Sequence, residues 1–175
     1  MKNTKLTFLI LLGFLIISCG FHLRGNQDLS AVLPEVQIQG VNEHSKTGRE
    51  LVRVLTAAKV SILEESEIIL NITRDDFSKR VLSLDSTGRA NQYEISYQLD
   101  FSLLKKIPVE DKQKLVDVVP AQSITARREY LFDANLVISK ADEEKRLNND
   151  MRQAAMLQLI RRLKYSLKSK ASVEK

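Results

Sequence analysis

Residues 93–103 have the sequence YEISYQLDFSL, in which six apolar side chains alternate with five polar ones. Because successive side chains of a β-strand point to opposite faces of its sheet, this alternation predicts a strand with one buried face. A helix would scatter the same apolar residues around its axis. The fold is therefore expected to depend on a sheet whose second face lies in water or against a polar partner.

Weaker alternation before this stretch predicts two further strands. The first covers residues 35–39, where Val36 and Ile38 alternate with polar neighbours. The second begins near Glu67 and continues to Leu84, with a bulge or bend at residues 74–76, where the pattern weakens. A tight turn at residues 85–88 (DSTG) then leads into the 93–103 strand, with Gly88 supplying a positive φ.

A fourth strand is predicted on the C-terminal side. Pro108 is expected to close the 93–103 strand, and residues 109–114 to form a charged turn. The fourth strand then extends from Leu115 to about Ile138. It is too long for one uninterrupted strand, so a break is expected near Pro120 or Asp133.

Two segments have the apolar spacing of amphipathic helices. In residues 45–59 the apolar side chains recur at one helical face, and either Thr47 with Glu50 or Ser45 provides the N-terminal cap. The last helix begins around Ala141, and its apolar row repeats every four residues: Leu147, Met151, Ala155, Leu159, Leu163 and Leu167.

These elements occur in the order β-α-β-β-β-α. They predict an α+β fold: a two-layer sandwich with two helices packed on one face of a mostly antiparallel four-stranded sheet. A chain of 175 residues suits one such domain, placed at residues 35–167. Residues 19–34 are expected to be a tether and lead-in, and residues 168–175 a C-terminal tail.

The first eighteen residues are predicted to be a signal peptide. Lys2 and Lys5 precede a short apolar run, which is too short to favour a permanent transmembrane helix. The run ends in residues 16–19 (IISC), which resemble the lipobox of bacterial lipoproteins, and Cys19 is the only cysteine in the chain. We expect Cys19 to be lipidated and to anchor the protein in a membrane; the alternative is a chance cysteine after an uncleaved signal. By resemblance to lipoprotein sorting signals, the following Gly20, in place of an Asp, implies the periplasmic side of the outer membrane over retention in the inner one.

Composition favours neither a nucleic-acid binder nor an enzyme. Loss of the signal peptide leaves 25 basic and 22 acidic residues, a small excess for a chain predicted to be exported. His22 and His44 lie too far apart in the predicted fold to favour a metal site, and no nucleophile–base or phosphate-loop motif is present. No cofactor is expected.

Five blocks of sequence, in order, resemble the LptE family of lipopolysaccharide-assembly lipoproteins. They are residues 19–25 (CGFHLRG), 88–94 (GRANQYE), 128–133 (REYLFD), 140–144 (KADEE) and 158–163 (QLIRRL). The resemblance implies a lipoprotein that plugs the β-barrel of LptD, helps it to assemble and contacts lipopolysaccharide.

The resemblance also implies where lipopolysaccharide is contacted. One cationic position of the family falls on Lys140. At the second position this chain has Ser86, and the nearby Arg89 is the expected substitute. Ammonium and guanidinium groups pair well with the phosphates of lipid A. The alternatives are that Lys140 is a solvated residue beside a helix cap, and that the protein is a structural periplasmic lipoprotein that binds another envelope partner without lipopolysaccharide.

Overall fold

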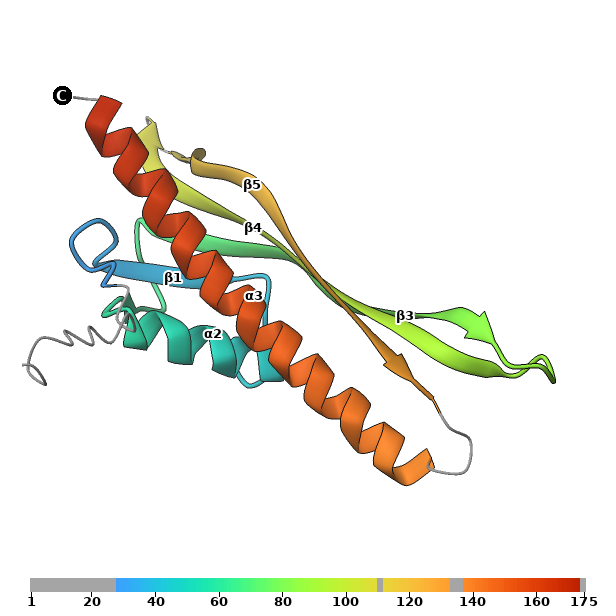
Figure 1. Ribbon diagram of the computed structural model, residues 1–175. Helices are drawn as coiled ribbons and strands as arrows, with labels where there is room; N and C mark the ends of the chain where they lie inside the picture. The colour runs from blue at the N-terminus through green and yellow to red at the C-terminus, as the bar shows by residue number, and fades with distance from the viewer. Residues whose placement is uncertain (1–27, 110–111, 133–136, 174–175) are drawn as a thin grey trace, which may run out of the picture.

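The computed structural model describes residues 28–109, 112–132 and 137–173 (Figure 1). The predicted signal peptide and Cys19 lie outside these residues. The elements follow one another as β1 (Glu35–Gln39), α2 (Lys46–Ala57), β2 (Ser61–Ile62), β3 (Ile68–Leu84), β4 (Ala90–Val109), β5 (Lys112–Leu131) and α3 (Val137–Val173).

The predicted α+β class is confirmed, but the sheet has five strands and is mixed. Its order is β2-β1-β3-β4-β5. The strands β3, β4 and β5 are antiparallel neighbours, whereas β1 runs parallel to both β2 and β3. The prediction of four mostly antiparallel strands was therefore wrong. It missed β2 because two residues are too few to show a periodic pattern, and it missed the parallel pairing of β1 because the alternation within a strand does not show the direction of its neighbour.

The C-terminal elements also differ from their predicted bounds. Strand β5 ends at Leu131 and α3 already begins at Val137, so the predicted continuation of the strand to Ile138 was wrong. The break expected near Pro120 is also absent: β5 is continuous from Lys112 to Leu131, and only its register with β4 shifts there, since Phe101 pairs with Gln122 while Leu103 pairs with Val119. At the other end, α3 continues to Val173.

The two long hairpin strands have the predicted features. A register shift between Ile72 and Arg74 gives β3 its bulge. The β3–β4 turn is closed by a hydrogen bond from the Gly88 amide to the Asp85 carbonyl oxygen, and Gly88 has a φ of +81°. Figure 1 shows this hairpin extending beyond the part of the sheet that α3 covers.

Both helices share one core with the same face of the sheet. The alternating residues of β4, including Tyr97, Leu99 and Phe101, are fully buried in this core. The predicted apolar row of α3 faces them, with Met151 and Leu159 fully buried. The core also contains three apolar side chains of α2 and two from the segment before β1: Leu51, Val54 and Leu55, and Leu29 and Leu33. The Ser45 hydroxyl, and not Thr47, caps α2 by accepting from the Gly48 amide at 2.9 Å.

Candidate functional site

The second face of the sheet carries rows of polar side chains from β3, β4 and β5. Strand register places Arg74 and Ser123 on either side of Asp100, and Asp76 and Thr125 on either side of Gln98. These positions alternate with the buried core residues of β4, so they point away from both helices. We call this set the open face: Arg74, Asp76, Ser78, Arg80, Glu94, Ser96, Gln98, Asp100, Ser123, Thr125, Arg127 and Glu129.

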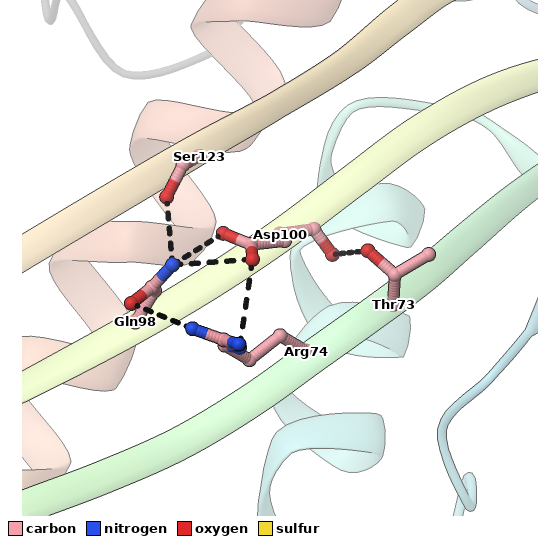
Figure 2. Close-up of polar contacts among 5 residues, drawn as sticks. All are labelled: Thr73, Arg74, Gln98, Asp100 and Ser123. Carbon is pink, nitrogen blue, oxygen red and sulfur yellow. Dashed lines mark hydrogen bonds and ion pairs between the residues drawn. The ribbon is translucent and has the colours of Figure 1, made fainter.

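Hydrogen bonds across the three strands fix the centre of the open face (Figure 2). The Gln98 amide donates to both carboxylate oxygens of Asp100, at 3.0 and 3.1 Å, and to the Ser123 hydroxyl at 3.3 Å. The Gln98 carbonyl oxygen in turn accepts from Arg74 at 3.2 Å. Hydrogen bonding from Ser123, together with Gln98 and Arg74, lowers the pKa of Asp100 against the opposing effect of desolvation. This carboxyl group therefore stays ionised near neutral pH.

The distal half of the open face is paired in the same way. The hydroxyl oxygens of Ser78 and Ser96 lie 2.7 Å apart, and Arg80 donates to Glu94 at 2.7 Å. That bond lowers the pKa of Glu94. The open face has three arginines and four carboxylates, so it is strongly polar but has little net charge. The open face is therefore better suited to contact with another polar protein surface than to binding a polyanion.

The two predicted lipopolysaccharide contacts lie outside the open face. Lys140 is in the first turns of α3, where its Nζ lies 2.7 Å from the Glu143 carboxylate and its side chain is 20% exposed. Arg89 directly follows the β3–β4 turn and is 71% exposed, with its Nε 3.5 Å from Asp85. The start of α3 and this turn lie at the same end of the molecule (Figure 1). Each cation, however, already has a local carboxylate partner.

The sequence predicts a polar face but does not reveal most of its residues. Alternation in β4 identified the even-numbered positions from Glu94 to Ser102. The outer half of β3 is polar on both faces, as at Asp75 and Asp76, so its alternation was not visible. Lys79 was also missed; it points toward α3 and pairs with Glu144 at 2.6 Å. The only feature of the sequence that distinguishes Lys79 is that a lysine occupies a strand position that faces inward.

Residues 28–109, 112–132 and 137–173 show neither a metal-binding cluster nor a membrane-spanning helix. No three His, Cys, Asp or Glu side chains in these ranges are grouped closely enough to hold a metal ion. Within the same ranges, no helix has the length and apolar character required to cross a membrane.

Comparison with known proteins establishes the family. The sequence pattern of the LptE family, described as "Lipopolysaccharide-assembly", matches residues 33–163. The chain belongs to the LptE family. That span includes all five strands, α2 and most of α3, so the family resemblance of the sequence blocks is confirmed.

Named relatives of this LptE-family chain are similar over most of their length. The LPS-assembly lipoprotein LptE of Photorhabdus laumondii is 27% identical over 168 residues, covering 93% of this chain and 87% of its own. The LptE of Pectobacterium atrosepticum is also 27% identical, covering 93% of this chain and 86% of its own.

Solved structures similar to this LptE-family chain have the same fold. Lipoprotein B of Nitrosomonas europaea has a TM-score of 0.62 at 28% identity, covering 89% of this chain and 96% of its own. The rare lipoprotein B of Shewanella oneidensis has a TM-score of 0.58 at 24% identity, covering 80% of this chain and 96% of its own.

Proposed function

We propose that this chain is an outer-membrane lipoprotein, held on the periplasmic side by acyl chains on Cys19, that plugs the LptD barrel and helps it to assemble. It contacts lipopolysaccharide during delivery to the outer leaflet. It acts by binding and not by catalysis. The observation that carries the proposal is the polar open face, which none of the described elements covers.

The chemistry of the open face fits the inside of a large β-barrel. Such barrels have apolar outer surfaces and polar interiors, so a plug needs a polar surface with satisfied hydrogen bonds. The Gln98–Asp100–Ser123 cluster provides such a surface, and mixed charges allow contact with a wall of either sign. An apolar uncovered face would instead favour lipid or self-association.

The lipopolysaccharide contact is assigned to Lys140 and Arg89. Lys140 is the fourth residue of α3 and Arg89 directly precedes β4, and the start of α3 and the β3–β4 turn lie at the same end of the molecule (Figure 1). A phosphate brought to this end would compete with Glu143 for Lys140 and with Asp85 for Arg89. Charge-assisted bonds to phosphate are strong enough for such an exchange.

Copurification tests the barrel partner. The lipidated chain, extracted from outer membranes in mild detergent, should bring down a large β-barrel protein in near one-to-one amount. Recovery alone, or with a different envelope protein such as a cell-wall synthase, would contradict the proposal. It would support a structural lipoprotein that acts without lipopolysaccharide.

Substitution tests the lipopolysaccharide contact. Replacing Lys140 and Arg89 together by glutamine should weaken lipopolysaccharide binding about tenfold, because two charge-assisted contacts are lost. Arg146→Gln is the matched control, since Arg146 is an exposed arginine of the same helix whose one hydrogen bond within the described part of the chain goes to the Asp142 backbone carbonyl oxygen. Equal affinity of the double variant and the control would remove this assignment.

A further inference from the structure

A groove between α2 and α3, away from the open face, is lined mainly by basic side chains. Its main part has a volume of about 440 Å³. A second hollow of about 280 Å³ shares Lys46, Asn149 and Arg152 with it and continues toward the start of α3. The cations that line the combined groove are Lys46, Arg49, Arg53, Lys145 and Arg152.

Of these five cations, only Arg53 forms an ion pair with a carboxylate of the groove. Glu50 is bonded to Arg53, which donates to it at 2.9 and 2.5 Å. Glu144 accepts from Lys79 at 2.6 Å and from the Tyr130 hydroxyl at 2.5 Å. Within the ranges that the structure describes, no carboxylate forms an ion pair with the four other cations: Lys46, Arg49, Lys145 and Arg152.

The placement of Lys46, Arg49 and Arg53 is unfavourable for the stability of α2. Lys46 and Arg49 lie in the first turn of α2, at the positive end of the helix dipole, and this turn contains no acidic residue. Arg49 and Arg53 are four residues apart, a spacing at which like charges repel. A bound anion would compensate both effects, so the arrangement is better explained by a ligand than by helix stability.

Arg152 is held in position by hydrogen bonds to neutral groups, although it also attracts the nearby Glu50 carboxylate. Its Nε donates to the Thr47 hydroxyl at 3.1 Å and another guanidinium nitrogen donates to Asn149 at 3.2 Å. The guanidinium also lies over the Phe77 ring, 4.9 Å from its centroid. A guanidinium has five N–H donors, so donors remain for a ligand. Its position is fixed before the ligand arrives.

One polar atom in the groove has no partner in the described structure. The side-chain oxygen of Asn148, which lines the second hollow, is buried and accepts no hydrogen bond there. A buried acceptor left unpaired costs roughly 1–3 kcal/mol. This oxygen only accepts, so a ligand must bring a donor such as a sugar hydroxyl, and because the oxygen is buried the Asn148 side chain must turn toward the hollow to receive it.

We infer that the α2–α3 groove binds a phosphate ester carried on a hydroxylated group. A doubly charged phosphate balances several unpaired cations at once, while each carboxylate of an acidic peptide would balance only one. A sugar phosphate and a glycerophospholipid headgroup both have this chemistry. The site is separate from Lys140 and Arg89, and it does not depend on the barrel partner.

Binding is tested on the full lipidated chain in nonionic detergent, with glucose 1-phosphate as the first probe. Arginine side-chain Nε–H signals in NMR spectra report the groove directly. Glucose 1-phosphate should shift the Arg49 and Arg152 signals in a saturable manner and bind more tightly than inorganic phosphate. Micelles doped with phosphatidylglycerol are the second probe. If the arginine signals shift only with these micelles, the ligand is a lipid headgroup; if they shift only with glucose 1-phosphate, it is a sugar phosphate. Shifts with both probes support the shared chemistry.

A double variant separates this site from general attraction to a basic protein. Lys46→Gln with Arg49→Gln changes two exposed side chains and should weaken binding about tenfold, whereas Arg146→Gln should leave it unchanged. Copurification with a barrel should persist in the double variant, which distinguishes this proposal from the preceding one. No shift with any phosphate probe, equal loss in Arg146→Gln, or preferential binding of an acidic peptide would overturn the inference.

Discussion

Lys79 on β3 and Glu144 on α3 form an ion pair across the helix-covered face, with Nζ and Oε2 2.6 Å apart. The ammonium group lies 4.2 Å from the centre of the Tyr93 ring, and the Tyr130 hydroxyl donates to the same carboxylate. Desolvation opposes ionisation of Glu144, but the bonds from Lys79 and Tyr130 outweigh it and lower its pKa. This cluster therefore fastens the beginning of α3 to the distal part of the hairpin.

Replacing Lys79 tests this attachment. Lys79→Met should lower the free energy of unfolding by about 1 kcal/mol, because a partly screened ion pair and a cation–π contact are lost. Amide hydrogen exchange should also become faster in the first turns of α3. Arg80→Met is the control, since Arg80 forms a similar pair with Glu94 on the open face. Equal exchange rates at the start of α3 in both variants would show that Lys79 does not hold the helix.

Two glycines with positive φ should respond differently to alanine. At Gly40, with a φ of +82°, an added Cβ would lie 1.9 Å from the Ile72 carbonyl oxygen, so Gly40→Ala should cost about 3 kcal/mol or more. At Gly88, with a φ of +81°, the space around the Cβ is open, so only the backbone strain of about 1 kcal/mol is expected. Urea unfolding of the two variants measures this difference. Similar losses of stability would contradict the close approach of Gly40 to β3.

Asp85 should give the β3–β4 turn a dependence on acid pH. Its carboxylate accepts from the Thr87 hydroxyl at 2.6 Å and from the Arg89 amide at 3.0 Å, and these bonds lower its pKa from 3.8 to about 2. Because the folded-state pKa is lowered, the stabilisation is complete above about pH 4 and is lost as the pH falls toward 2. Thr87→Ala should raise this pKa, as measured by NMR titration of the Asp85 carboxyl carbon. An unchanged midpoint would exclude the Thr87 hydroxyl as its cause.

Sequence periodicity predicted the elements whose two faces differ. In β4 the inward positions such as Leu99 are apolar and the outward ones such as Gln98 are polar, so the strand was identified correctly. The end of β5 and the start of α3 were misplaced because the apolar pair Val137 and Ile138 can continue a strand pattern equally well. Strand β2 has no pattern of its own, since its two residues pair only after α2 has brought the chain back beside β1.

Candidate sites were harder to predict because they depend on pairing between distant segments. The open face combines three strands, and only the register shows that Arg74 and Ser123 both adjoin Asp100. The α2–α3 groove was missed because Lys46 and Arg49 are ordinary surface residues until Arg152 lies opposite them. Lys140 and Arg89 were selected by family resemblance, and no periodicity or spacing distinguished them from other cations.

Photocrosslinking from the open face most directly tests whether a barrel covers it. Thr125 is exposed on this face beside Gln98, so a photoreactive residue there can be introduced without disturbing the core. In cells that process the lipoprotein normally, irradiation should join this position to an LptD-sized outer-membrane β-barrel. Folded and lipidated protein that crosslinks to no barrel from Thr125 would contradict the account.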